Sequence, residues 1–208
     1  MTHYPFELPP LPYAYDALEP YIDTLTMELH HDRHLKTYTD NLNAALKDHP
    51  EYHSWSLEKL ITGANWLPEA LRTPVKNNAG GVYNHVFFFS NLTPEQGLHP
   101  DEALLEAIDS AFGGFEEMTK AFATEAAAVF GSGYAWLAAD AKGGLTIVKT
   151  ANQDTLLTRG LFPVICIDVW EHAYYLKHYN KRAGYIQDWV HIVNWETANT
   201  YFKAAQAR

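Results

Sequence analysis

An apolar segment that ends in a carboxylate constrains this chain more than any other feature. Residues 162–167 are short, β-branched and almost wholly apolar, which is typical of a strand buried on both faces. Asp168 follows directly, and His172 lies four residues further on. An ionised aspartate at the buried end of a strand needs a strong partner, which can be a metal ion, an arginine or a helix N-terminus. Such a pair four residues apart is also common on ordinary helix surfaces, so the spacing alone leaves the partner open.

The composition excludes several classes of partner. The 208 residues are 47% hydrophobic, enough for a sizeable core in one domain or two small lobes. A formal net charge of -10, with 15 Lys and Arg spread along the chain, argues against nucleic acid. The sequence has neither a membrane-spanning apolar run nor the charge pattern of a secretory signal. The single cysteine, Cys166, allows no disulfide framework, so we expect a protein of the reducing cytoplasm.

The first half of the chain is predicted to be all helical. Apolar residues recur at helical spacing over residues 16–46, which predicts one long helix or two with a bend. A second helix is predicted over residues 76–89, after a connection that ends at Pro74. This helix contains Gly80 and Gly81, and each interior glycine costs about 1 kcal/mol relative to alanine. The pair indicates a close approach to the backbone, although simple helix packing explains it equally well.

The second half is predicted to mix helices and strands. Two helices are expected first, over residues 101–108 and 115–130. Three strand-like segments follow, at residues 134–138, 145–148 and 163–167. A Lys-Gly-Gly turn joins the first two as a hairpin, and the chain returns to helix over residues 171–201 with a break near Gly184.

These elements predict a fold of class α+β in two domains. A linker rich in proline and glycine, residues 91–101, separates the two kinds of pattern. We therefore expect an N-terminal, hairpin-like helical domain over residues 1–94. A C-terminal α/β domain over residues 95–208 would hold a small three-stranded antiparallel sheet.

Four of the eleven histidines stand out because they lie on or beside aromatic and apolar faces. A neutral imidazole in such a place needs a hydrogen-bond partner or a metal, and this applies to His30, His34, His85 and His172. Taken singly, each is more often a satisfied core histidine. Taken together, three of them with Asp168 form a three-nitrogen, one-carboxylate set that suits Zn, Mn or Fe. Both halves of the chain contribute, so we expect the site between the two domains.

Six segments, in this order along the chain, resemble those of the iron/manganese superoxide dismutases. They are LPYAYDALEPYID (11–23), HHDRHLKTY (30–38), NNAGGVYNH (77–85), FGSGYAWL (130–137), TANQD (150–154) and DVWEHAYYLKHYNKR (168–182). The last is highly specific, and the resemblance covers nearly the whole chain. It implies one Mn ion per subunit, or Fe, bound by His30, His85, Asp168 and His172. Alternate reduction and oxidation of that ion would disproportionate superoxide to dioxygen and hydrogen peroxide.

The resemblance also implies roles for residues beside the metal. Tyr38 matches the family's gateway tyrosine, and Gln153 matches the glutamine that hydrogen-bonds the metal's solvent ligand. His34 would relay protons together with Tyr38. Gln153 follows the second strand instead of lying on the helix of His85, which indicates the manganese-preferring type. Its side chain is then expected to fill the space left at Gly81.

A further set is expected at a subunit interface and around the site. Glu171 matches the carboxylate that reaches the metal-binding histidine of a partner subunit, and Tyr175 matches a residue that meets the partner in a homodimer or tetramer. Trp136 and Trp170 would keep bulk water from the metal. Arg182 would attract the anionic substrate at the mouth of the funnel.

Two residues depart from the family pattern, and two other functions stay open. Tyr134 stands where most members have tryptophan, and Phe89 replaces the tryptophan four residues beyond the second histidine. Both lie in the aromatic shell, so the use of iron or of either metal stays possible. The same donors could hold Zn in a hydrolase, which would lack an obvious general base because Glu171 is assigned to the interface. A metal-storing relative would bind metal without dismutation.

Overall fold

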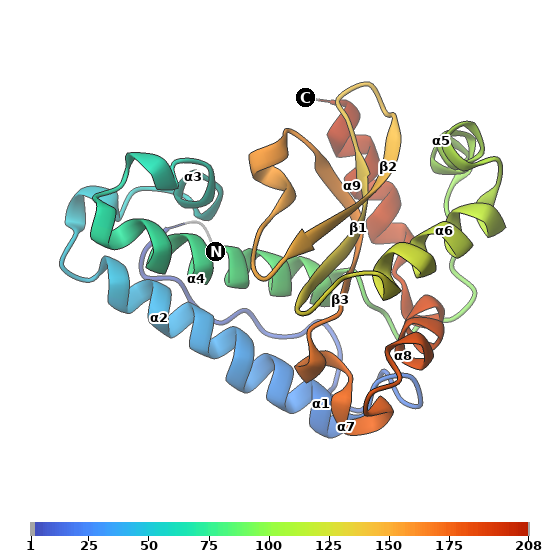
Figure 1. Cartoon of the computed structure of the whole chain (residues 1–208), viewed down its shortest axis with the longest axis horizontal. Helices are drawn as coiled ribbons and strands as arrows, with labels where there is room; N and C mark the ends of the chain where they lie inside the picture. The colour runs from blue at the N-terminus through green and yellow to red at the C-terminus, as the bar shows by residue number, and fades with distance from the viewer. Residues whose placement is uncertain (1–2, 208) are drawn as a thin grey trace.

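Two long helices form one part of the molecule, and a three-stranded sheet wrapped by shorter helices forms the other (Figure 1). The computed structural model describes residues 3–207. The predicted α+β class is confirmed, because the first half is helical and the second half holds an antiparallel sheet. No helix within residues 3–207 combines the length and the apolar character needed to cross a membrane.

The first long helix begins later than predicted. Helix α1 spans Thr24–Leu29, and the Asp23 side chain caps it by accepting the backbone N–H of Thr26 at 2.9 Å. The prediction that the helix starts at residue 16 is wrong, because residues 16–22 form turns. Leu25 and Leu29, which lie in this helix, are exposed.

From residue 24 to residue 46 the predicted continuity of this helix is confirmed, with a π-helical segment between its two α-helical parts. Residues His30–Leu35 take the π conformation between α1 and α2, which spans Lys36–Leu46. Such segments are rare and occur frequently at functional sites. The segment begins at a predicted metal ligand.

The second long helix, α4, spans Glu69–Ser90 and packs antiparallel to α2 (Figure 1). The prediction that it starts after Pro74 is wrong, since Pro74 lies inside it. Pro74 lies close to the start of the helix, and it has no N–H to bond to the carbonyl four residues earlier. Shorter elements join the two long helices: η2 (Pro50–Tyr52), α3 (Leu57–Thr62) and η3 (Ala64–Trp66).

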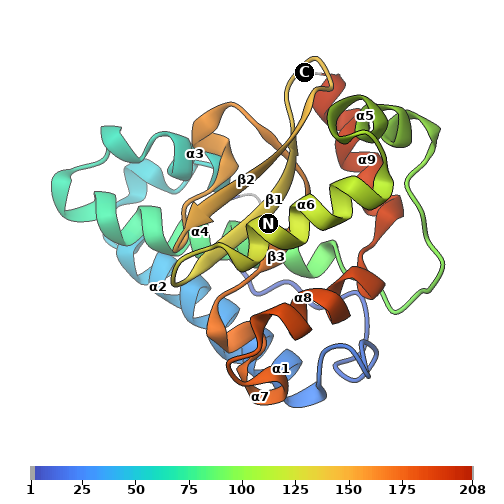
Figure 2. The ribbon, with the colours of Figure 1, turned by 45° about the vertical axis from the view of Figure 1, so that its right-hand side comes forward.

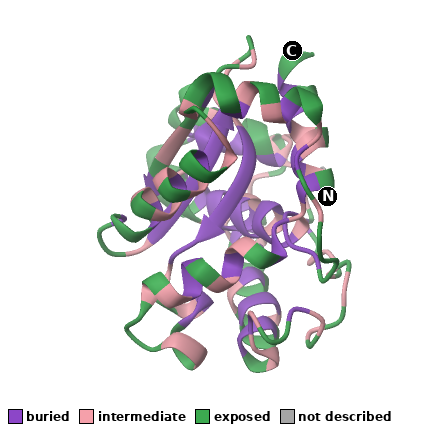
Figure 3. Cartoon of the chain, turned by 90° about the vertical axis from the view of Figure 1, so that its right-hand side faces the viewer, coloured by how far each residue is buried: buried purple, intermediate pink, exposed green. Residues whose placement is uncertain are grey.

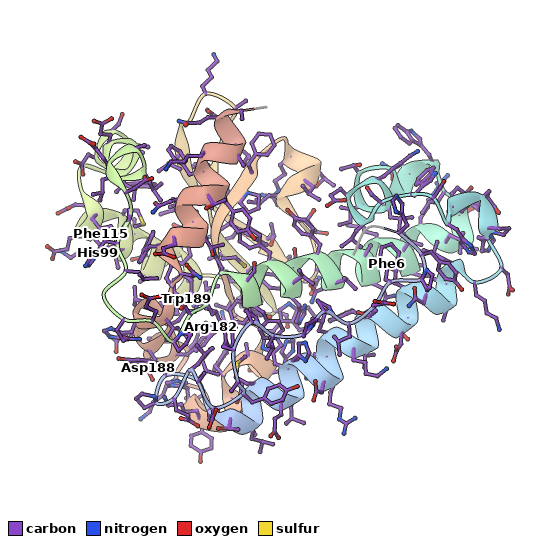
Figure 4. The ribbon with its side chains drawn as sticks, turned by 180° about the vertical axis from the view of Figure 1, so that it is seen from behind. Phe6, His99, Phe115, Arg182, Asp188 and Trp189 are labelled. Atoms are coloured by element: carbon purple, nitrogen blue, oxygen red, sulfur yellow. The ribbon has the colours of Figure 1, made fainter. Side chains whose placement is uncertain are left out.

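The N-terminal arm packs along the helical domain. The Phe6 ring is buried, and its backbone N–H and carbonyl both bond to the side chain of Asn43 on α2, at 2.8 and 2.7 Å (Figure 4). The arm is thereby tied to the long helix.

The sheet has the order β2-β1-β3, with both pairs antiparallel. Strand β1 (Gly133–Ala139) lies in the centre, between β2 (Leu145–Ala151) and β3 (Phe162–Asp168). Every residue of β1 and all but the first of β3 are buried, so both faces of these strands are covered (Figure 3). The register places Tyr134 opposite Asp168, the last residue of β3.

Helices cover this sheet. Helix α6 (Phe115–Ala127) contacts β1 and β2, whereas α4 and α9 (Trp195–Gln206) contact β3 (Figure 2). The remaining elements are α5 (Glu102–Phe112), η4 (Leu156–Arg159), η5 (Glu171–Ala173), α7 (Tyr175–His178), α8 (Arg182–Trp189) and η6 (Val190–Ile192). The break predicted near Gly184 lies a few residues earlier, at Tyr179, whose φ is 50°, and Gly184 itself lies inside α8.

Candidate metal centre

The four predicted ligands converge between the two domains. His30 comes from the π-helical segment, His85 from α4, Asp168 from the end of β3 and His172 from η5. One ligand atom from each lies within 4.8 Å of the other three. Asp168 Oδ2 is 3.2 Å from His30 Nε2, 3.6 Å from His172 Nε2 and 3.8 Å from His85 Nε2.

These four ligand atoms are buried, and no hydrogen bond satisfies any of them. The 3.2 Å separation of His30 Nε2 and Asp168 Oδ2 lacks the alignment of a hydrogen bond. Four unpaired polar atoms that face one point are costly unless a ligand occupies that point. Three imidazole nitrogens and one carboxylate oxygen suit Mn, Fe or Zn. The residues therefore fit a metal ion.

Neighbouring hydrogen bonds orient the ligand atoms. Asp168 Oδ1 accepts the backbone N–H of Trp170 at 2.8 Å, which leaves Oδ2 for the cluster. His85 Nδ1 lies 2.7 Å from the carbonyl oxygen of Gly81, so Nδ1 carries the proton and the lone pair of Nε2 faces the cluster.

The protonation states also suit a metal. Burial lowers the pKa of His30 to about 4, although Asp168 opposes this, and burial lowers the pKa of His85 well below its ordinary value. Burial alone would raise the pKa of Asp168, but His172 and His30 outweigh it and hold that pKa below its usual range. Near pH 7, His30 and His85 are thus neutral and Asp168 is ionised, the forms that bind metals.

A turn after β2 brings Gln153 to residues that surround the cluster. Asn152 takes a left-handed conformation with φ of 50°, which asparagine tolerates better than most residues, and this turns the chain back toward the site. Gln153 Nε2 donates to the Tyr38 hydroxyl at 3.0 Å. Its Oε1 accepts the Tyr134 hydroxyl at 3.0 Å and Asn84 Nδ2 at 3.2 Å.

The glycine pair allows two close approaches. A Cβ at Gly81 would lie 2.5 Å from ring carbons of Tyr38, and one at Gly80 would overlap the backbone oxygen of Gln153. The expectation that the Gln153 side chain fills the space at Gly81 is therefore wrong. The Tyr38 ring fills it, and Gln153 uses its main chain at the neighbouring glycine.

Comparison with known proteins decides the family. Residues 5–93 match the profile described as "Iron/manganese superoxide dismutases, alpha-hairpin domain", and residues 100–201 match that described as "Iron/manganese superoxide dismutases, C-terminal domain". The chain belongs to the iron/manganese superoxide dismutases. These matched ranges lie on either side of the boundary predicted at residue 94.

Relatives named as manganese superoxide dismutases resemble the chain over nearly its full length. The protein of Pseudomonas aeruginosa is 49% identical over 201 residues, 96% of this chain and 98% of the relative. That of Listeria monocytogenes is 49% identical over 97% of this chain and 99% of the relative. One from Leptolyngbya boryana is 46% identical over 99% of this chain and 86% of the relative.

Aromatic rings surround the centre of this superoxide dismutase family member. The His34 ring stacks on His172 with centroids 3.9 Å apart, and burial lowers the pKa of His34 to about 4. The Trp170 ring lies 5.5 Å from His172. Phe89, one of the two departures, packs 4.9 Å from His30. These rings flank two of the four ligands.

Trp136 lies on the sheet, where its ring packs against Tyr134. It is fully buried, and its indole N–H donates to Thr150 Oγ1 at 2.9 Å. The ring also packs against Phe87. Trp136 therefore supports the shell from the sheet, whereas Tyr134, on the same face of β1, reaches His85.

Arg182 is held at the start of α8. Its guanidinium donates to the carbonyls of Val129 and Gly131, and its Nε donates to the Tyr174 hydroxyl at 3.2 Å (Figure 4). The positive charge is thus fixed beside the loop that leads into β1.

Two participants in this superoxide dismutase site escaped the sequence reasoning. Asn84 is fully buried and bonds to Gln153, and the signal for it was a polar side chain beside His85 on an apolar helix face. Tyr134 was noted only as a departure from the family pattern. Its hydrogen bond to Gln153 depends on the sheet register, which the sequence does not specify.

Proposed function

We propose that this chain disproportionates superoxide to dioxygen and hydrogen peroxide, with one Mn ion per subunit and Fe as the alternative metal. The observation that carries the proposal is the set of four buried, unpaired ligand atoms that face one point. Family membership supports it. The free thiol of the buried Cys166 fits a reducing cytoplasm, where the enzyme would act as an antioxidant.

A Mn or Fe ion held by this ligand set supplies reversible one-electron chemistry, which Zn does not. Two superoxide anions and two protons give one dioxygen and one hydrogen peroxide. The protein must therefore deliver protons while it keeps bulk water out.

Tyr38 is suited to be the proton donor that lies nearest the metal centre. Burial raises the pKa of its phenol, although the bond from Gln153 opposes this, so the hydroxyl stays protonated near pH 7. Its oxygen accepts from Gln153 Nε2, which leaves its own O–H for another acceptor. His34, four residues earlier on the same helix, is half-buried and can pass protons inward from solvent.

The protein must also exclude bulk water from the site and attract an anionic substrate. Trp170 and Phe89 flank the ligands, with Trp136 behind Tyr134, so their apolar surface limits the access of bulk water. The chain has a net charge of -10, so an anionic substrate needs a locally favourable field. Arg182, held in place by backbone carbonyls, supplies fixed positive charge.

We further propose a homodimer that uses the face of α1 and α7. These helices pack together, and the exposed large apolar side chains there are Leu25, Leu29, Tyr175, Leu176 and Tyr179. The loop of residues 129–131, which precedes β1, carries Phe130, whose side chain is fully exposed. Hydrogen bonds from Arg182 hold this loop against α8. Contiguous exposed apolar surface is typical of an interaction site. Glu171, exposed beside His172, would then reach the corresponding histidine of a second copy.

The test separates the proposed function from its alternatives. The metal-free chain is loaded with Mn, Fe or Zn, the metal content is measured, and superoxide decay is followed by stopped-flow spectroscopy. We expect catalysed decay with Mn, lower or equal decay with Fe, and none with Zn. Bound Mn or Fe without catalysed decay would identify a metal-storing protein, and ester or phosphoester hydrolysis by the Zn form would identify a hydrolase.

A further inference from the structure

We propose that Tyr13 and Tyr15 are positioning residues, which tie the two ligand-bearing helices together through the N-terminal arm and so help to retain the metal. The arm is the segment of residues 6–15. The inference rests on the metal centre of the proposed function. Neither tyrosine is a candidate ligand, and each acts through a helix that carries one.

The arm is anchored at its start and just beyond its end. At the start, the Phe6 ring is buried, and the Phe6 backbone bonds to the side chain of Asn43 on α2 (Figure 4). Three residues beyond the end, Leu18 is fully buried. Fixed φ angles restrict the backbone between these anchors at three prolines, Pro9, Pro10 and Pro12. The arm can therefore act as a tie with few accessible conformations.

Two arm residues hold the π-helical segment that begins at His30. The Tyr15 hydroxyl donates to Asp32 Oδ1 at 2.8 Å, and His31 Nδ1 lies 2.7 Å from the same oxygen. His31 Nε2 lies 2.8 Å from the carbonyl oxygen of Pro9. A carbonyl oxygen can only accept, so this nitrogen carries a proton and donates it. These bonds fix the two residues that directly follow the first ligand.

Tyr13 holds the other helix, α4, near its C-terminal end. Its hydroxyl donates to the backbone carbonyl of Phe89 at 2.9 Å. The last carbonyls of a helix lack partners within the helix, so a side chain can bind one of them there. Burial raises the pKa of Tyr13, so its hydroxyl keeps the proton that this bond needs. Phe89 lies four residues beyond His85, and its ring packs 4.9 Å from His30.

The two hydroxyls belong to residues two apart in the arm, but they bind different helices. The arm thus bridges the helices of His30 and His85 close to the ligands themselves. The convergence of these two imidazoles with Asp168 requires a fixed separation of the helices. Loss of either bond should let the helices move apart and weaken the hold on the metal.

The experiment measures the rate at which the Mn-loaded chain loses Mn to an excess of the chelator EDTA. Tyr13→Phe removes the hydroxyl and keeps the ring. We expect the rate of Mn loss to rise about three- to tenfold, as for one lost hydrogen bond. A rate equal to that of the unaltered chain would overturn the proposal.

Tyr201→Phe is the matched control. The Tyr201 hydroxyl lies 3.0 Å from Ser90 Oγ, at the same end of α4, but Tyr201 belongs to α9. The change therefore removes a bond of the same kind from the same helix without altering the arm, and Mn loss should stay within twofold of the unaltered rate. An equal acceleration in both variants would mean that any loosening of α4 releases the metal, which would also overturn the proposal.

A second variant and a double variant test whether the two bonds act as one tie. Tyr15→Phe should also raise the rate about three- to tenfold, and it decides by the same criterion if Tyr13→Phe does not fold. The double variant should lose Mn within twofold of the faster single variant, because releasing either helix already opens the tie. Multiplied single effects would indicate two independent contacts and overturn the proposal. Failure of the proposed function is distinct, since the unaltered Mn-loaded chain would then not dismutate superoxide.

Discussion

The ring of Tyr38 occupies the space that a side chain at Gly81 would need. A Cβ at Gly81 would lie 2.5 Å from both Cγ and Cδ1 of that ring. The glycine therefore lets the helix that carries His85 approach the helix that carries His30. The same approach sets the Tyr38 hydroxyl 3.0 Å from Gln153 Nε2.

Gly81→Ala should displace Tyr38 and break its hydrogen bond with Gln153. Overpacking of this kind costs about 1–3 kcal/mol of stability, partly offset by the better helix propensity of alanine. We expect superoxide dismutation to fall about tenfold, as for one lost hydrogen bond at the site. Stopped-flow decay and urea unfolding check both effects. Gly184→Ala is the control, since its Cβ would meet nothing closer than 3.3 Å, and equal activity of the two variants would contradict the packing argument.

Asp168→Ala should abolish metal retention. The change removes the carboxylate on which three imidazole nitrogens converge, and it leaves the His172 and His30 rings without their buried anion. Metal content after dialysis against a chelator is the measurement, and circular dichroism verifies the fold. Asp154→Ala removes a carboxylate that pairs with Lys76 at the surface, and it should keep its metal. One ion per chain in the Asp168 variant would show that the ligand assignment is wrong.

Glu171→Ala should weaken the dimer and the activity together. Glu171 is exposed in the single chain and stands next to His172, so its proposed partner belongs to a second copy. Sedimentation equilibrium with activity at matched concentrations measures both effects. Glu106→Ala, on the exposed face of α5, should change neither. A monomeric variant with full activity would rule out the interface role.

The metal-free chain should lose stability as the pH falls from about 6.5 to about 4. The folded-state pKa of His30, about 4, lies below its unfolded value, so the unfolded chain binds more protons in this window. The contribution is fully present above pH 6.5 and amounts to about 3 kcal/mol. Urea unfolding at pH 7 and pH 4.5 is the measurement. His30→Gln should reduce the dependence without abolishing it, because burial also lowers the pKa of His85 and His34. A pH-independent free energy of unfolding in the unaltered chain would refute the expectation.

The local pattern of apolar and turn residues was sufficient to predict the three strands and most of the helices. The three strands were predicted because each is short and rich in aromatic, apolar or β-branched residues, and because turn signals bound them. The start of the first long helix was misplaced, since apolar spacing continues through residues 16–22 while the Asp23 cap decides where the helix begins. Apolar periodicity indicates which residues face the core, but capping hydrogen bonds determine where a helix begins and ends.

The sequence by itself determined the class of fold and the identity of the ligand set. The residues His30, His85, Asp168 and His172 carry their chemistry in their side chains, and the motifs around them are specific. Only the tertiary structure decided what lies beside them, namely that Tyr38 fills the space at Gly81 and that Tyr134 holds Gln153. Those contacts join residues far apart in the chain. They depend on helix separation and strand register, which packing of the whole chain fixes and no local pattern encodes.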